Sequence, residues 1–154
     1  MHRAKKSSAY FDNASAVAAV KEVYRDLAER PIERNCTLKT ECCRFVLTGE
    51  TPYLTKGEAL VAAKAVRNIG RKEMPKRVDG ACSLLHPRTA RCLIYQDRPF
   101  GCRTHFCQAA GGPYARKEVV DLIHRLEEID QKLDGTGSRD LHTAVGESLK
   151  DLRY

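Results

Sequence analysis

The side chains of this chain best suited to chemistry are its cysteines. Seven occur among 154 residues, and thiolates are ligands both of zinc and of iron–sulfur clusters. Their odd number argues against a complete disulfide framework. Metal binding is therefore the chemistry that the cysteines predict, with candidate ligands at Cys36, Cys42, Cys43, Cys82, Cys92, Cys102 and Cys107.

The rest of the composition bears on where such chemistry would take place. Residues 1–13 carry charges with no apolar segment behind them, and residues 14–20 are too short and too rich in alanine for a signal peptide or a membrane span. We expect a cytoplasmic protein with no membrane partner. Thiols stay reduced in that compartment, which again favours metal over disulfides.

Four of the cysteines lie in residues 81–107, where a β-hairpin is expected. Two apolar runs, 84–85 and 93–95, flank a loop at residues 86–89. A turn centred on Pro87 would make Cys82 and Cys92 cross-strand partners, about 4.5–5.5 Å apart at their Cβ atoms. Pro99 and Gly101 would then bend the chain and bring Cys102 to the same place.

The cysteines differ in how well they suit a shared site. Neighbouring side chains in an extended segment point to opposite faces, so Cys42 and Cys43 are not both expected to bind one metal. The alternative role for Cys107 is that of a small apolar side chain buried in the core. His105 is a further candidate ligand. The spacings match neither zinc ribbons nor ferredoxins, so they leave the metal open. The favoured ligands are Cys82, Cys92 and Cys102, with a fourth from Cys36, Cys42 or Cys43.

The excess positive charge is concentrated around the cysteines. Residues 35–115 hold thirteen Lys or Arg against six Asp or Glu, while the flanking segments nearly balance. A tetrathiolate zinc site or a four-iron cluster has a net charge of about −2, which nearby basic side chains would offset. A nucleic-acid surface is the less favoured alternative, since no platform of aromatic and basic residues is present.

Apolar side chains at helical spacing predict helices on both sides of the cysteines. We expect helices at 14–30, 114–133 and 139–152. A further helix is expected to begin at a capping box formed by Thr55 and Glu58. The predicted fold is helix-rich α+β, with three or four helices around a small β-hairpin and irregular loops organised by the cysteine metal site. We expect one domain over 1–154, with a metal-binding core at 35–107 between the helix 14–30 and the helices within 114–152.

The spacing of the cysteines and of their neighbours resembles a known family. Residues 36–43 read Cys-x5-Cys-Cys, residues 82–92 read Cys-x9-Cys, and residues 95–103 read Tyr-x2-Arg-Pro-x2-Cys-Arg. This pattern resembles the YkgJ-like cysteine-cluster family of zinc- or iron-chelating domains, which is related to the flagellin lysine methylases. The family's opening motif is Cys-x2-Cys-x2-Cys-Cys, and Lys39 stands at its second cysteine.

The resemblance implies a metal cofactor and roles for two arginines. An iron–sulfur cluster (4Fe-4S) is favoured, because that cofactor is associated with the methylase members, and zinc is the alternative. Arg98 and Arg103 match the family motif and are expected to donate hydrogen bonds to thiolate or sulfide. The alternative for these arginines is an ion pair with Asp97 or Glu41.

Two classes of function remain open at this stage. The favoured one is a metal-binding protein with a structural or redox role that serves a protein partner. The alternative is a protein-modifying enzyme, such as a lysine methyltransferase. The sequence offers no phosphate-cradling glycine loop and no acid–base constellation, so we predict no catalytic residues.

Overall fold

The computed structural model describes residues 11–31, 52–76, 81–86, 88–89, 91–104 and 113–152. In this part of the chain, five α-helices and one two-stranded antiparallel sheet confirm the expected helix-rich α+β class. The helices are α2 (Asn13–Ala28), α4 (Lys56–Asn68), α5 (Phe100–Thr104), α6 (Arg116–Lys132) and α7 (Leu141–Asp151), with a 3-10 turn η2 at Tyr95–Asp97. The strands are β1 (Tyr53–Leu54) and β2 (Arg139–Asp140), which pair Tyr53 with Asp140 and Leu54 with Arg139.

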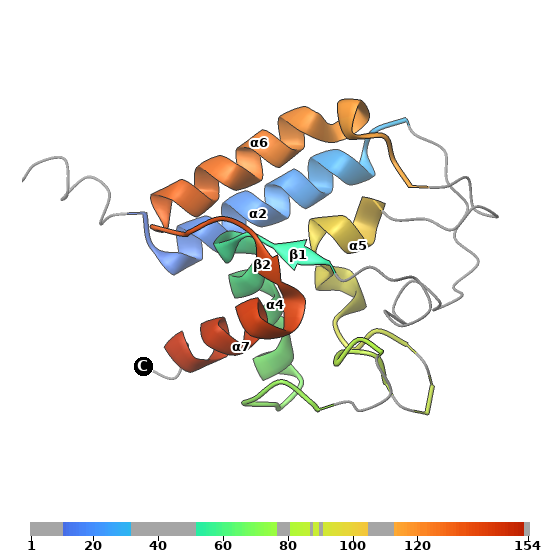
Figure 1. The fold of residues 1–154 in the computed structure, drawn as a ribbon, viewed down its shortest axis with the longest axis vertical. Helices are drawn as coiled ribbons and strands as arrows, with labels where there is room; N and C mark the ends of the chain where they lie inside the picture. The colour runs from blue at the N-terminus through green and yellow to red at the C-terminus, as the bar shows by residue number, and fades with distance from the viewer. Residues whose placement is uncertain are drawn as a thin grey trace, which may run out of the picture.

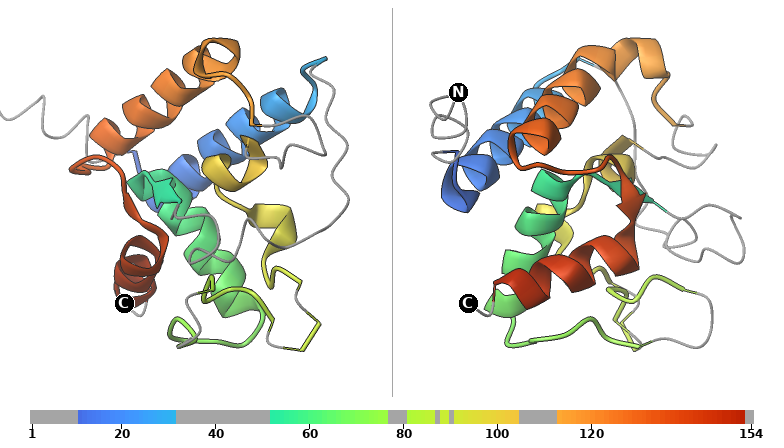
Figure 2. Two further views of the ribbon diagram at one scale, coloured as in Figure 1. Left: turned by 45° about the vertical axis from the view of Figure 1, so that its right-hand side comes forward. Right: turned by 60° about the vertical axis from the view of Figure 1, so that its left-hand side comes forward.

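Helix α4 is the central element of the fold. It contacts α2 and α6 on one side and α7 on the other, so nearly every side chain between Gly57 and Val66 is buried (Figure 1). Figure 2 shows α2 and α6 side by side on one side of α4, with α7 crossing its other end. The small alanine side chains of α4 let the neighbouring helices approach it closely.

Two clusters of buried side chains lie on either side of α4. The first joins α4 to α7 and to the 81–94 segment, and it includes Cys82. The second joins α2, α6 and the start of α5 through residues such as Leu60, Val61 and Phe100. Gly57 allows α2 and α6 to approach α4 closely, because a Cβ atom there would lie 2.9 Å from a methyl group of Val20 and 2.9 Å from one of Ile129.

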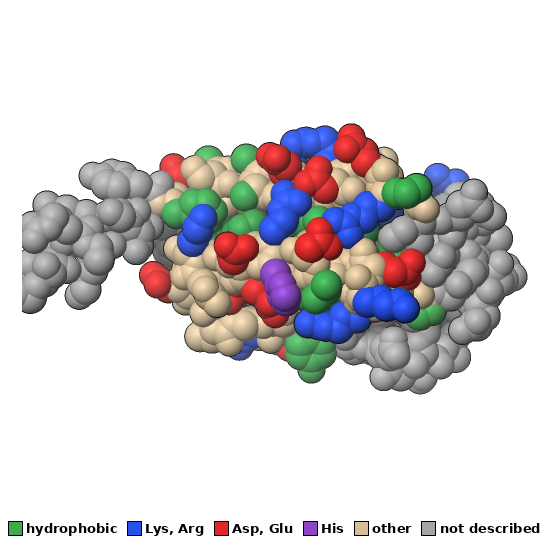
Figure 3. Space-filling view, turned by 90° about the horizontal axis from the view of Figure 1, so that it is seen from above, with side chains coloured by type: hydrophobic (Ala, Val, Ile, Leu, Met, Phe, Trp, Pro, Cys, Tyr) green, Lys and Arg blue, Asp and Glu red, His purple; other side chains and the backbone are tan. Residues whose placement is uncertain are grey.

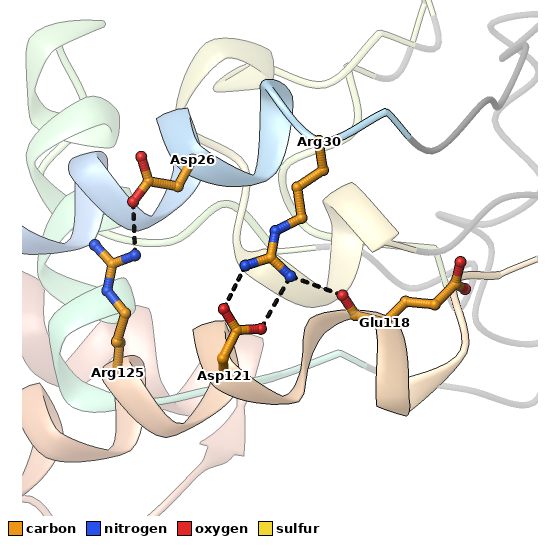
Figure 4. A network of polar contacts seen from close by, with 5 residues as sticks. All are labelled: Asp26, Arg30, Glu118, Asp121 and Arg125. Atoms are coloured by element: carbon orange, nitrogen blue, oxygen red, sulfur yellow. Dashed lines mark hydrogen bonds and ion pairs between the residues drawn. The ribbon is translucent and has the colours of Figure 1, made fainter.

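Helices α2 and α6 run antiparallel and are joined by ion pairs along their outer edge. Arg30 Nη1 donates to Asp121 Oδ1 at 2.9 Å and to the backbone oxygen of Glu118 at 2.7 Å (Figure 4). One turn away, Arg125 pairs with Asp26 at 2.6 Å. Basic and acidic side chains alternate over the face seen in Figure 3. Such exposed pairs add little stability each and mainly fix how the two helices are aligned.

The structure corrects the predicted hairpin. Cys92 forms an isolated bridge with Leu85, and hydrogen bonds at 2.8 Å join His86 N to Arg91 O and Leu93 N to Leu84 O. The turn is therefore centred between Arg88 and Thr89, and the expected pairing of Cys82 with Cys92 is wrong. The cause is His86, whose Nδ1 accepts hydrogen bonds from Arg88 N and Thr89 N, both at 3.1 Å, and so places the turn after itself.

Other sequence predictions agree with the structure more closely. The expected ends of α2, α6 and α7 all lie within two residues of the observed ends, and α4 begins where the capping box predicted. The short helix α5 was not predicted. The sheet was not predicted either, because each of its strands has only two residues and they lie far apart in the sequence.

Among the described helices, none combines the length and apolar character that crossing a bilayer requires.

Glu58 joins α4 to α5 through a carboxylate that is only 3% exposed. Its Oε2 accepts hydrogen bonds from Thr55 N and Thr55 Oγ1, both at 2.9 Å, which confirms the predicted capping box. Its Oε1 accepts from Phe100 N at 2.8 Å, at the first residue of α5. One buried side chain therefore caps the N-termini of two helices that are 42 residues apart in the sequence.

The ionisation of Glu58 gives the first prediction. Burial raises the pKa of Glu58 from its ordinary value of 4.5, although the hydrogen bonds from Thr55 and Phe100 oppose this shift. The folded protein thus binds this proton more tightly than the unfolded chain does. The contribution of Glu58 to the free energy of unfolding is largest below pH 4.5 and falls as the pH rises through the raised pKa.

We therefore expect the difference in free energy of unfolding between wild type and Glu58→Gln to shrink as the pH rises from 4.5, as measured by urea denaturation at several pH values. Glu128→Gln, on the exposed side of α6, controls for the change of one charge. Parallel pH curves for wild type and Glu58→Gln would contradict the assignment.

Candidate metal centre

Cys102 lies on α5. The side chains of Arg98 and Arg103 donate hydrogen bonds to backbone carbonyl groups in the segment 95–102, and we call this set of contacts the clasp. Arg98 Nε donates to Tyr95 O at 3.1 Å, and Arg98 Nη1 donates to Cys102 O at 3.3 Å. The guanidinium carbon of Arg98 lies 4.0 Å from the centre of the Tyr95 ring, a cation–π distance. Arg98 thus connects the turn before α5 to the carbonyl of the cysteine itself.

Arg103 closes the same clasp from the other side of Cys102. Its Nε donates to Arg98 O at 2.7 Å, and its Nη2 donates to Gln96 O at 2.8 Å. Its guanidinium carbon lies 4.0 Å from the centre of the Tyr24 ring on α2. Burial lowers the pKa of Arg103 from its ordinary value, but a guanidinium stays protonated under all ordinary conditions.

Pro99 completes the turn into α5. It is fully buried, and its carbonyl accepts hydrogen bonds from Cys102 N at 3.1 Å and from Arg103 N at 3.2 Å. Proline fixes φ near the helical value and is well suited to the start of a helix. Every non-cysteine residue of the Tyr-x2-Arg-Pro-x2-Cys-Arg motif therefore shapes the backbone that carries Cys102.

These contacts give the two arginines a role that the sequence did not indicate. The described hydrogen bonds of Arg98 and Arg103 go to backbone carbonyl groups, and Asp97 lies 3.8 Å from Lys21 Nζ. Donation from either arginine to a metal-bound sulfur stays a prediction. An ion pair with Glu41 falls outside the described residues.

Cys82 and Cys92 lie on the other side of α4 from α2. Cys82 is 6% exposed in the first core cluster, in a tight turn in which Leu85 N donates to Cys82 O at 3.0 Å. Cys92 is half-buried and packs against the same cluster. The loop between them is shaped by the His86 ring, and Ser83 Oγ lies 2.9 Å from His142 Nδ1 on α7. Both histidines thus have roles in packing or in turns.

The described part of the chain contains three of the predicted ligands, Cys82, Cys92 and Cys102. Within that part, no group of three or more Cys, His, Asp or Glu side chains is arranged to hold a metal ion. The remaining candidates, Cys36, Cys42, Cys43, Cys107 and His105, lie outside the described residues. As a donor set, reduced thiols suit soft or borderline metals such as zinc and iron.

Sequence reasoning missed two residues next to the clasp. Glu58 was expected only as part of a capping box, and Tyr24 only as a packing residue of its helix. Glu58 accepts a hydrogen bond from Phe100 N, at the first residue of α5, and Tyr24 packs against the guanidinium of Arg103, next to Cys102. Nothing in the spacing of the motif indicates either contact, because each joins segments more than forty residues apart.

The fold and the thiols together define a helix-rich α+β domain built around a cysteine motif. A family model named CxxCxxCC, with the description "Putative zinc- or iron-chelating domain", matches residues 34–129, and the chain belongs to this family. The match confirms the family expected from the cysteines and supports a metal cofactor. No curated protein and no solved structure matches the chain significantly.

The clasp gives the second prediction. Replacing Arg103 with Met leaves Arg98 O and Gln96 O without their charged donor and removes the cation–π contact with Tyr24. We expect Arg103→Met to lower the free energy of unfolding by about 2–4 kcal/mol. Urea denaturation of the two proteins measures this difference.

Arg125→Met is the matched control, since Arg125 forms an exposed ion pair with Asp26. Arg125→Met should lower the free energy of unfolding by less than about 1 kcal/mol. Equal destabilisation by the two substitutions would show that Arg103 is no more than another surface arginine.

Proposed function

We propose that this chain holds a metal through cysteine thiolates and serves a protein partner in a structural or redox role. The observation that carries the proposal is the arrangement around Cys102, where the motif residues fix the backbone at the cysteine. Membership of a zinc- or iron-chelating family points to the same chemistry. Of the two metals, we favour an iron–sulfur cluster and keep zinc as the alternative.

The residues that would hold the metal are Cys82, Cys92 and Cys102, with one of Cys36, Cys42 and Cys43. When bound, a cluster would supply electron transfer, whereas zinc would supply structural cross-linking alone. The guanidinium groups of Arg98 and Arg103 lie in the turn that carries Cys102. Their charge would offset part of the negative charge of four thiolates.

The surface near the clasp suits a protein partner. Tyr95 is 42% exposed and lies under the guanidinium of Arg98. Tyrosine and arginine are enriched at protein interfaces, because they combine a large contact area with directional hydrogen bonds. A partner bound at Tyr95 would lie within a few residues of Cys102, which suits a redox role.

Anaerobic purification followed by visible spectroscopy and by analysis of iron, sulfide and zinc tests the proposal. We expect a coloured protein with iron and acid-labile sulfide. A colourless protein with about one zinc per chain would replace the cluster by a structural zinc site. A chain that retains neither metal and binds neither on reconstitution would reject the proposal.

Single Ser substitutions give the third prediction. Serine removes the thiolate and changes little else in volume, so Cys82→Ser, Cys92→Ser and Cys102→Ser should each lose most of the bound metal. Cys107→Ser should lose much less and serves as the control. Metal content per chain, measured after gel filtration, gives the result, and equal loss at Cys107 would mean that the ligand set is wrong.

Removal of the metal gives the fourth prediction. Among the described residues, the second core cluster contains no cysteine, whereas the first includes Cys82 and packs against Cys92. Metal binding is linked to folding where the ligands come from distant segments. Chelation should therefore lower the melting temperature and increase amide exchange around Cys82 and Cys92, while α2 and α6 stay protected. Unchanged exchange after complete removal would contradict this linkage.

A further inference from the structure

Tyr24 is the buried residue against which the Arg103 guanidinium packs. It is 4% exposed on α2, and its ring lies beneath the Arg103 guanidinium at 4.0 Å. Burial raises the pKa of Tyr24 well above its ordinary value, and the charge of Glu58 raises it further. The phenol therefore stays neutral, and its ring presents an electron-rich face to the cation.

The hydroxyl of Tyr24 behaves differently from its ring. It lies near enough to Glu58 to lower the pKa of that carboxyl, yet within the described residues it makes no hydrogen bond of ordinary geometry. A buried hydroxyl without such a bond is a cost to the folded state. The favourable contacts of Tyr24 are thus made by its ring, which packs in the second core cluster and against Arg103.

Helix α5 depends on contacts of this kind. It has only five residues, too few to be stable alone. Glu58 holds its first residue through Phe100 N at 2.8 Å, and Arg103 holds the turn before it through Arg98 O and Gln96 O. Tyr24 in turn packs against the guanidinium that makes these two bonds. Cys102 lies between the two points of attachment.

We propose that Tyr24 is a positioning residue for Cys102, acting through the Arg103 guanidinium. Residue 24 lies before the matched family segment 34–129, so the match does not include it. The expected effect of Tyr24 on metal affinity rests on the proposed function, whereas its expected effect on the position of Cys102 does not. Helix α2 thereby becomes part of the metal site and not merely a packing element.

The test uses the full chain with Tyr24→Leu, which removes the aromatic face, and Tyr24→Phe, which keeps it and removes only the hydroxyl. The first measurement is the alkylation rate of Cys102 in metal-free protein, followed by peptide mass spectrometry. The second is the Zn²⁺ dissociation constant, from competition with a chromophoric chelator. Tyr24→Leu should speed alkylation several-fold and weaken Zn²⁺ binding roughly tenfold or more, as is typical for residues that support metal ligands.

Val20→Ala is the control, because Val20 lies one turn earlier on α2 and contacts Gly57 of α4. Tyr24→Phe and Val20→Ala should both match the wild type in alkylation of Cys102 and in Zn²⁺ affinity. An effect of Tyr24→Phe as large as that of Tyr24→Leu would overturn the proposal, since the hydroxyl would then be the active group. Equal effects of Tyr24→Leu and Val20→Ala would also overturn it, since general loss of packing would then explain both.

The two measurements separate this inference from the proposed function. A wild type that binds no Zn²⁺ speaks against the metal site, whereas the alkylation of Cys102 still tests whether Tyr24 positions the cysteine. Where circular dichroism shows that Tyr24→Leu does not fold, Tyr24→Met replaces it, because its longer chain fills more of the same volume without an aromatic face. The expected result for Tyr24→Met is the same, and a wild-type alkylation rate in that variant would reject the role.

Discussion

The carboxylate of Glu58 is the interaction on which the arrangement of this domain depends. Because Thr55, Gly57 and Glu58 are buried, the unpaired N–H groups at the start of α4 cannot rely on water and must find an acceptor inside the protein. Glu58 supplies it from the first turn of the same helix and uses its second oxygen for Phe100 N. A short helix that could not form alone is thereby attached to the central helix of the fold.

From that attachment a continuous set of contacts extends to Cys102. Glu58 fixes the first residue of α5, Arg98 reaches the carbonyl of Cys102, and Arg103 returns to the backbone before the helix. A thiolate ligand has to be held within a few tenths of an ångström to suit one metal geometry. The motif arginines meet that need by binding carbonyl groups, so their effect on a metal would act through the shape of the backbone as well as through their charge.

The sequence predicted the parts of this structure that have a strong local signature. Apolar periodicity located α2, α4, α6 and α7, and Thr55 with Glu58 marked the start of α4. The turn between Cys82 and Cys92 was misplaced, because spacing gave no sign of the hydrogen bonds that the His86 ring accepts from Arg88 N and Thr89 N. Helix α5 and the β1–β2 pair are too short for any periodicity to show. The contacts of Phe100 with Glu58 and of Arg103 with Tyr24 are tertiary, so spacing carried no sign of them.

The positions of the three described cysteines relate metal binding to packing. Cys82 and Cys92 belong to the cluster between α4 and α7, while α5 carries Cys102 and begins at Phe100 in the cluster with α2 and α6. A metal bound by both groups would add a direct link between two cores that lie on either side of α4. In the proposed site, ligand geometry and core packing then constrain each other, because a shift of either cluster against α4 moves thiolates relative to one another. The proposed effect of Tyr24 would enter this coupled system through the Arg103 guanidinium, which lies 4.0 Å from its ring.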